Sequence, residues 1–151
     1  MANKHGDFIW YELLTSDADA AVTFYGSVLE WTIADSGMPG MDYRIINAGK
    51  NSVGGLMAIT AEMAEHGARP TWLGYIAVND VDDCVTSVEH GGGKTLMPAM
   101  DIPNVGRIAM VTDPQGAPFY VMKPASTDGE SLAFAHDQPR IGHCAWNELV
   151  T

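Results

Sequence analysis

Residues 106–123 read GRIAMVTDPQGAPFYVMK and predict two strands joined by a tight turn. Apolar side chains at Ile108 and Met110 alternate along the first strand, and the extended pattern resumes from Phe119. Between the strands, residues 113–116 (DPQG) supply a polar residue, a proline that fixes φ and a glycine that accepts a positive φ, as a reverse turn requires. Both faces of the second strand are largely apolar, because its side chains alternate. We therefore expect one face to pack on helices and the other to line a functional site.

The composition limits the class of protein. A chain of 151 residues is long enough for one domain, or two small packed modules, with a hydrophobic core. The formal net charge of −11 argues against nucleic acid or anionic membrane as a partner. The sequence has no apolar run of membrane-spanning length, so we expect a cytoplasmic protein. Cys84 and Cys144 lack a CxxC spacing and are expected to be reduced and structural.

The same order of predicted elements occurs twice along the chain. The first round comprises a strand, a helix and three strands at residues 8–15, 18–31, 31–35, 43–48 and 52–59. The second round has the same order at residues 71–78, 81–90, 94–100, 106–112 and 118–123. Residues 60–67 are interpreted as a connector. We therefore predict an α+β fold in which two paired βαβββ modules, about 7–60 and 71–124, have curled mixed sheets that enclose a cleft.

These two modules make up a predicted domain over residues 1–124, and the rest of the chain has a different character. Residues 125–139 are polar and rich in turn-forming residues, which is typical of a linker. Residues 146–151 (WNELVT) are identical to residues 10–15 (WYELLT) at four of six positions. We therefore predict that residues 140–151 form an orphan strand resembling the start of a further module, as in the front part of a tandem protein.

Several motifs together resemble a known family. They are FYGSVLEW at residues 24–31, EHGGGK at residues 89–94 and DPQGAPFYV at residues 113–121, combined with the repeated βαβββ order. Over about residues 7–124 the chain is similar to the vicinal oxygen chelate superfamily, which includes glyoxalase I, extradiol dioxygenases and bleomycin-resistance proteins. The IWYELLT and VGGLM segments and the second WxEL segment look most like glyoxalase-like proteins built from tandem module pairs.

The resemblance implies a divalent metal ion held by His, Glu or Gln on the first and last strand of each module. The corresponding positions in this sequence are Trp10, Gly55, Tyr75 and Tyr120. Indole and glycine side chains do not coordinate metal ions, and neutral phenols are poor ligands compared with imidazole or carboxylate. We therefore expect neither a metal ion nor another cofactor.

With aromatic residues at the ligand positions, the predicted cleft becomes an aromatic cup suited to a small organic ligand. Its expected ligand-binding residues are Trp10, Arg44, Met57, Tyr75, Arg107, Met110, Tyr120 and Met122. The alternative is that the aromatic side chains simply fill the space. Arg44 and Arg107 either bind an anionic group of a ligand or neutralise nearby acidic residues.

Glu12 is the candidate catalytic residue. It follows Trp10 by two positions, so both side chains are expected on one face of the first strand. Desolvation in an aromatic cup would favour the protonated carboxyl, which suits a general base or a hydrogen-bond donor. The alternative is that Glu12 lies near the rim and pairs with Arg44 or Arg107.

Three functions are consistent with these features. The first is a metal-independent glyoxalase-like protein that binds a small organic ligand and catalyses lyase-type or isomerase-type proton transfer. The second is a sequestering module of the bleomycin-resistance type, which binds without chemistry. The third is a structural half of a tandem-module protein. Besides the small molecule, the expected partner is a second copy or a further module pair, joined through the C-terminal strand.

Overall fold

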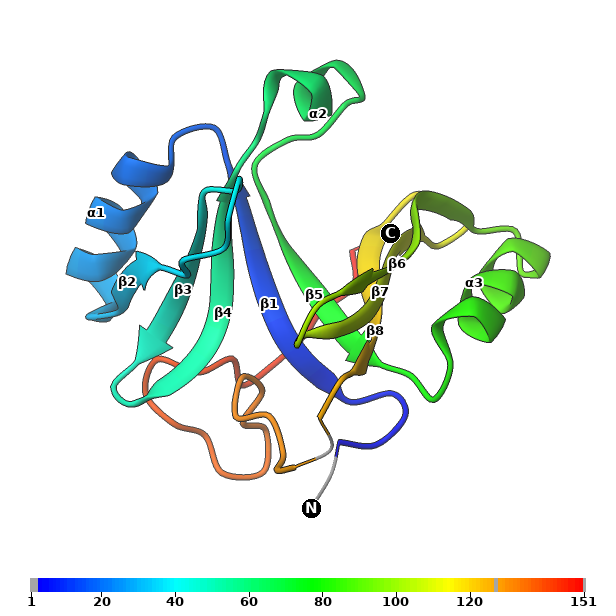
Figure 1. Ribbon diagram of the computed structural model, residues 1–151. Coiled ribbons are helices and arrows are strands. Elements are labelled where there is room, and N and C mark those ends of the chain that lie inside the picture. The colour runs from blue at the N-terminus through cyan, green and yellow to red at the C-terminus, as the bar shows by residue number, and fades with distance from the viewer. Residues whose placement is uncertain (1–2, 127, 151) are drawn as a thin grey trace. The chain divides into compact units, whose positions relative to one another are not determined.

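The structure is a computed structural model that describes residues 3–126 and 128–150. Residues 1–2, 127 and 151, which belong to the predicted domain, linker and C-terminal strand, lie outside the described part. The elements in chain order are β1 (Phe8–Thr15), α1 (Ala18–Leu29), β2 (Thr32–Asp35), β3 (Tyr43–Ala48), β4 (Asn51–Ala58), α2 (Ala61–Glu65), β5 (Thr71–Ala77), α3 (Val81–His90), β6 (Lys94–Ile102), β7 (Gly106–Thr112) and β8 (Pro118–Pro124). The predicted α+β class is confirmed (Figure 1).

The chain divides into two compact units. Residues 10–73 and 132–146 form one, which we call the α1 unit. The α3 unit comprises the described residues of 3–9, 74–131 and 147–150. In the α1 unit the strand order is β2-β3-β4-β1, and in the α3 unit it is β6-β7-β8-β5. In both, the consecutive strands pair antiparallel and the strand before the helix pairs parallel with the last strand.

The two main helices begin with the same local structure. The Asp17 carboxylate accepts a hydrogen bond from the Ala20 amide at 2.9 Å, and the Asp80 carboxylate accepts one from the Asp83 amide at 3.0 Å. Such N-caps satisfy amides that have no partner inside the helix. The helix α1 ends at Leu29, two residues before the predicted end, because Glu30 adopts a left-handed conformation with φ of 57°.

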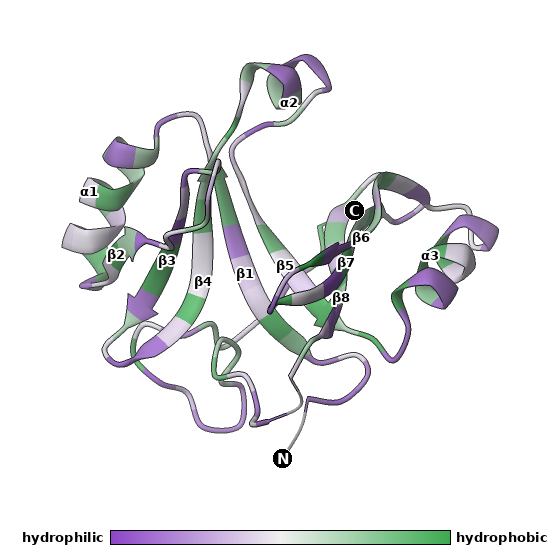
Figure 2. Ribbon diagram, viewed as in Figure 1, coloured by the Kyte–Doolittle hydropathy of each residue, from purple (hydrophilic) through white to green (hydrophobic). Residues whose placement is uncertain are grey.

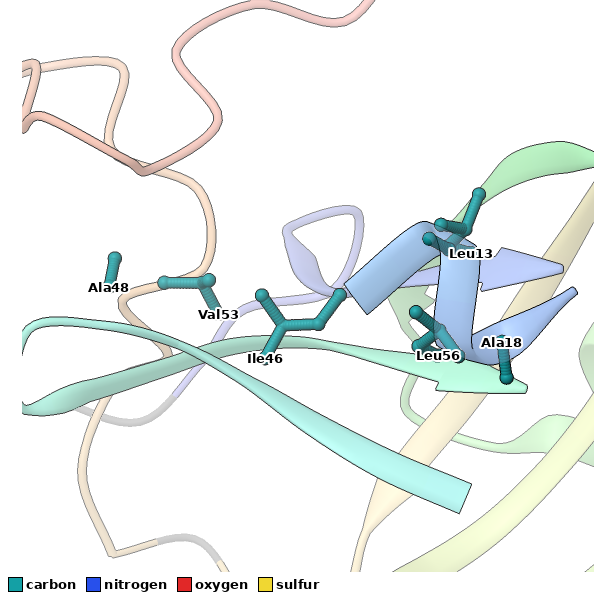
Figure 3. Packing of buried hydrophobic residues seen from close by; sticks show 7 residues of the cluster. Leu13, Ala18, Ile46, Ala48, Val53 and Leu56 are labelled. Atoms are coloured by element: carbon teal, nitrogen blue, oxygen red, sulfur yellow. The ribbon is translucent and has the colours of Figure 1, made fainter. Parts of the chain in front are cut away.

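The core of the α1 unit lies between α1 and one face of its strands. Its buried members are Leu13, Ala18, Ala21, Ile46, Ala48, Val53 and Leu56. Figure 3 shows Ile46 beside Val53, and Leu56 beside Ala18. The pairing of Leu13 with Leu56 across β1 and β4 places both side chains on this face. The strand alternation of apolar residues therefore decides which face α1 covers.

The core of the α3 unit follows the same rule. Its buried members are Val78, Val81, Ala109, Val111 and Val121. Ala109 pairs with Val121 across β7 and β8, so both point toward the face that α3 covers. Figure 2 shows hydrophilic and hydrophobic residues interspersed along α3, as expected for a helix with one buried side.

The turn predicted at residues 113–116 is present and joins β7 to β8. The Asp113 carboxylate accepts hydrogen bonds from the amides of Gln115 and Ala117 at 2.9 and 2.8 Å. The Gly116 amide donates to the Asp113 carbonyl, and Gly116 has a φ of 94°. The polar first residue and the glycine thus have the roles that the sequence assigns to them.

The C-terminal segment differs from its prediction. Among the described residues 140–150 there is no strand, only an isolated parallel bridge between Phe134 and Cys144. A strand needs a neighbouring strand to pair its amides and carbonyls, and the bridge is the only pairing assigned to these residues. Within the α1 unit, the Trp31 indole donates to the Gly142 carbonyl at 2.9 Å, which holds residues 140–146 to the rest of this unit.

Candidate functional site

The face of the α1-unit strands opposite the helix carries most of the predicted site residues of this unit. In the register of β1 and β4, Glu12 lies opposite Gly55 and Leu14 lies opposite Met57. In β3 and β4, Tyr43 lies opposite Met57. Because neighbouring residues in register point to the same side of a sheet, these side chains share one face.

Trp10 and Tyr43 are hydrogen-bonded on this face. The Trp10 indole Nε1–H donates to the Tyr43 hydroxyl oxygen at 3.0 Å. The same hydroxyl lies where a Cβ on Gly55 would stand, and the ring atom Cε1 of Tyr43 would be 2.9 Å from that Cβ. Only glycine therefore leaves room for the Tyr43 side chain on β4.

Glu12 lies in the strand next to this contact. Its side chain is buried, with the residue 2% exposed. Neighbouring strands are about 4.8 Å apart, so the Tyr43 hydroxyl above Gly55 lies beside Glu12. The predicted proximity of Trp10 and Glu12 on one face of β1 is consistent with this arrangement.

The α3 unit has a face made of aromatic and methionine side chains. Tyr75 and Tyr120 are paired in register across β5 and β8, and both are buried. Their rings stack with centroids 4.2 Å apart and an interplanar angle of 14°. Met110 lies opposite Tyr120, and the buried Met122 lies opposite Ala77. The four predicted residues of this unit therefore share the face opposite α3.

Arg44 and Arg107 lie on the other, helix-bearing faces. Arg44 is in register with Leu56, a member of the core under α1, and its guanidinium bonds to Asp19 at 2.7 Å. Arg107 bonds to Asp82 at 2.8 Å, two residues into α3 from its N-cap. Of the two roles considered from the sequence, these ion pairs favour the neutralisation of acidic residues.

Both arginines have a second acidic partner, and the pairs shift the titration of their members. Arg44 also bonds to Asp42 at 2.9 Å, and Arg107 also bonds to Asp101 at 3.1 Å. The hydrogen bonds from Arg44 lower the pKa of Asp42, and those from Arg107 lower the pKa of Asp82. Hydrogen bonds to these aspartates raise the pKa of both arginines. The aspartates of these pairs are largely exposed, so each pair is a weak contribution to stability.

In this chain, the positions that correspond to the metal ligands of the family do not form a suitable set of donor atoms. The place of a Gly55 side chain is occupied by Tyr43, and the rings of Tyr75 and Tyr120 stack on each other. Among residues 3–126 and 128–150, no three His, Cys, Asp or Glu side chains converge as a metal site requires. The metal-independent interpretation remains a prediction, since its test is elemental analysis.

The repeat of the βαβββ order also refines the first-strand position that the sequence assigned to Trp10. The capping residues Asp17 and Asp80 are separated by 63 residues, and the same separation relates Glu12 to Tyr75. The register supports this equivalence, because Glu12 faces Gly55 and Tyr75 faces Tyr120. Glu12, two residues after Trp10, is therefore the first-strand counterpart of Tyr75.

Tyr43 is the site residue that sequence reasoning missed. A signal for it existed, because Tyr43 and Ile45 alternate on one face of a predicted strand next to the paired glycines of β4. What the sequence lacked was the register between the strands, which alone places the phenol over Gly55.

A strand, a helix and three further strands in each unit, with the first and last strand parallel, define the class of fold. The chain belongs to the Glyoxalase/Bleomycin resistance protein/Dioxygenase superfamily, whose family model matches residues 8–121. This confirms the family that the sequence resembles.

Curated relatives include the Mycobacterium bovis protein named "Putative glyoxylase CFP32", which is 40% identical over 126 residues. That match covers 83% of this chain and 47% of the relative. The Anthracycline biosynthesis protein DauV of Streptomyces sp. is 30% identical over 159 residues, covering 94% of this chain and 54% of the relative. The chain therefore spans about half the length of these curated relatives.

Among solved structures, methylmalonyl-CoA epimerase from Mycobacterium tuberculosis matches with a TM-score of 0.59 and 16% identity. The match covers 83% of this chain and 93% of the epimerase. At this identity the similarity establishes the fold alone. In the described part of the chain no helix is long and apolar enough to cross a membrane.

Proposed function

We propose that this chain is a metal-independent member of the superfamily that binds a small organic ligand on the α1-unit face carrying Trp10, Glu12 and Tyr43. The observation that carries the proposal is the hydrogen bond from the Trp10 indole to the Tyr43 hydroxyl beside the buried Glu12. Aromatic rings supply flat apolar surface, while the phenol and carboxyl groups orient polar atoms of a ligand.

Glu12 is proposed to move a proton of the bound ligand. A carboxylate oxygen of Glu12 accepts a proton from a carbon next to a carbonyl group, the C–H electron pair stays on the ligand, and the proton returns to the same or a neighbouring atom. Its position supports this role, because Glu12 lies on the same strand face as Trp10 and Tyr43, where a bound ligand would be within reach of the carboxylate. No oxidant or reductant is consumed.

The remaining predicted residues extend the proposal. Met57 lies on the proposed face of the α1 unit, and Tyr75, Met110, Tyr120 and Met122 form the aromatic and methionine face of the α3 unit. We also propose that the two units are paired modules of the tandem-module subgroup, which agrees with relatives about twice as long as this chain. A homodimer and a cytoplasmic location stay predictions.

Binding can be tested with an anthracycline, a flat polycyclic ligand class suggested by the name of one relative. Titration calorimetry should show binding that Trp10→Ala weakens about tenfold or more, equivalent to about 1.4 kcal/mol. Trp146→Ala is the matched control, because Trp146 is largely exposed and should leave the affinity unchanged. If a panel of flat and carbonyl-bearing ligands shows no binding that depends on Trp10, the proposed site is wrong.

Proton transfer is tested separately. In D2O, a bound carbonyl ligand with an acidic C–H should exchange that hydrogen for deuterium, as followed by NMR. Glu12→Gln should abolish exchange while the dissociation constant stays within about twofold, since the shape of the side chain is kept. Ligand binding without exchange in the unsubstituted protein would instead assign the sequestering function.

A further inference from the structure

The edge strand of the α3 unit, β6, departs from regular pairing with β7. The register shifts once between Thr95 and Met97 and again between Met97 and Met100. Met97 lies opposite Met110, and Met100 lies opposite Ile108. Between these two pairs β6 advances by three residues while β7 advances by two, which is the arrangement of a β-bulge.

The extra residue decides the face on which two methionine side chains lie. In a regular strand, residues three positions apart point to opposite faces. Met97 and Met100 are three positions apart, but their partners Met110 and Ile108 are two apart and share a face. Ala109, between those partners, belongs to the core under α3. The bulge therefore brings both β6 methionines to the face opposite this helix.

This face gathers thioether groups from neighbouring strands. Residues in register across two antiparallel strands have Cβ atoms about 4.5–5.5 Å apart, and diagonal neighbours are about 7–8 Å apart. Met97 is the in-register neighbour of Met110, and Met100 is its diagonal neighbour. An unbranched side chain with three rotatable bonds spans such distances, so the three sulfur atoms can meet at one point. Met100 is 46% exposed, which leaves this point accessible from solvent.

We propose that Met97, Met100 and Met110 form a binding site for a soft monovalent metal ion, Cu(I), with their three thioether sulfur atoms as ligands. Thioethers select Cu(I), whereas Mg²⁺, Ca²⁺ and Mn²⁺ prefer oxygen ligands. The formal net charge of −11 favours the approach of a cation. Bulges commonly re-aim a side chain toward a functional site, and here the bulge assembles the ligand set.

The proposed copper site is separate from the positions at which the family resemblance implies a metal ligand. In this unit those positions are Tyr75 and Tyr120, whose rings stack on each other. Met110 also belongs to the aromatic and methionine face that extends the proposed ligand site. Ion binding and ligand binding are therefore measured separately, and a ligand that fails to bind at Trp10 leaves the copper site untouched.

The first test uses Ag(I), a soft monovalent ion that is stable in air. The free thiols of Cys84 and Cys144 would compete for it, so both are replaced by alanine in the full chain. If the replaced chain does not fold, the unsubstituted chain is titrated past the two equivalents that its thiols consume.

The titration is followed by NMR of protein labelled with ¹³C at the methionine methyl groups. One equivalent of Ag(I) should shift the signals of Met97, Met100 and Met110 together and leave that of Met41 in place. No shift, or shifts confined to other methionines, would overturn the proposal.

A matched pair of substitutions tests the ligand set with Cu(I) itself. Met100→Leu removes a sulfur atom at nearly constant volume, and Met41→Leu is the control because Met41 is 48% exposed and lies in the α1 unit. Competition with a chromophoric Cu(I) chelator under reducing conditions should show an affinity at least about tenfold lower for Met100→Leu. Met41→Leu should leave the affinity unchanged. Equal affinities of the two variants would contradict the proposal and assign these methionines to apolar packing.

Discussion

The Tyr43 hydroxyl occupies the position that a side chain on Gly55 would take. Gly55 faces Glu12 in the neighbouring strand. The Tyr43 phenol therefore lies next to the Glu12 carboxylate, the candidate catalytic group. The resemblance to the family implies a metal ligand at the position of Gly55, on the last strand of the module. Here the position is filled from the side by a residue of β3.

Gly55→Ala should therefore destabilise the protein. The added methyl group would overlap the Tyr43 side chain, and overpacking of this kind costs about 1–3 kcal/mol. In a Tyr43→Ala background the same substitution should cost less than about 0.5 kcal/mol, because the overlap is gone. Urea unfolding of the four proteins measures both values.

Gly54→Ala is the control for that pair. A Cβ on Gly54 would stand 2.6 Å from the carbonyl oxygen of Tyr11, which belongs to the backbone and cannot turn away. Its cost should thus be the same with Tyr43 or Ala at position 43. Equal behaviour of the Gly54 and Gly55 substitutions would show that Tyr43 does not fill the place of a Gly55 side chain.

The Trp10–Tyr43 hydrogen bond should be measurable as a coupling energy. Trp10→Phe and Tyr43→Phe each remove one partner, and the double substitution completes a thermodynamic cycle. A partly buried bond between neutral groups contributes about 1 kcal/mol. A coupling energy near zero in urea unfolding would mean that the indole and the phenol are not bonded in solution.

The Arg107–Asp82 pair should affect the stability of the protein toward acid. Because Arg107 lowers the pKa of Asp82, the folded state has the lower pKa. The pair therefore stabilises the folded state above the unfolded pKa of about 4, and this stabilisation is lost as the pH falls through the folded value. Arg107→Gln should reduce the stability slightly at pH 7, and the difference should shrink as the pH falls below about 4.

Arg69→Gln serves as the control for the acid titration. The Arg69 guanidinium donates to the carbonyl of Ala68, so its removal should leave the pH dependence of unfolding unchanged. A constant offset between Arg107→Gln and the unsubstituted protein from pH 2 to pH 7 would contradict the assigned role of Asp82.

Cys84 should react slowly with alkylating reagents. Burial raises the pKa of its thiol, and the thiolate is the reactive form. In a Cys144→Ser protein, the rate of reaction with iodoacetamide should rise at a higher pH in the folded chain than in urea. Coincident rate profiles in the two conditions would show that the thiol is not shielded.

Gly142 should hold the segment of residues 140–146 against the rest of the α1 unit. A Cβ there would stand 2.9 Å from that of Ala48 and 3.0 Å from the Trp31 indole nitrogen, besides the strain of a positive φ. Gly142→Ala should thus release the segment and increase its cleavage by protease. Gly129→Ala has a similar φ of 94° and no neighbour within 4 Å, so it should leave cleavage of that segment unchanged.

The two arginines illustrate where prediction from the sequence stops. Each lies 25 residues after the aspartate that it binds, Asp19 for Arg44 and Asp82 for Arg107. The sequence repeat around these aspartates is visible, yet the sequence leaves open whether the arginines bind a ligand or neutralise acidic residues. A one-residue change of strand position moves a side chain to the opposite face, so only the register decides between the helix face and the ligand face.

The sequence by itself determined the order of the two repeated sets of strands and helix, the turn at Asp113 and the family, because these depend on local patterns within a few residues. The repeat of WxEL also came from the sequence alone. The tertiary structure decided that Tyr43 fills the place of a Gly55 side chain and that Arg44 and Arg107 bind helices. Those relationships join residues of different elements, and the distances between such residues are set by strand pairing and packing.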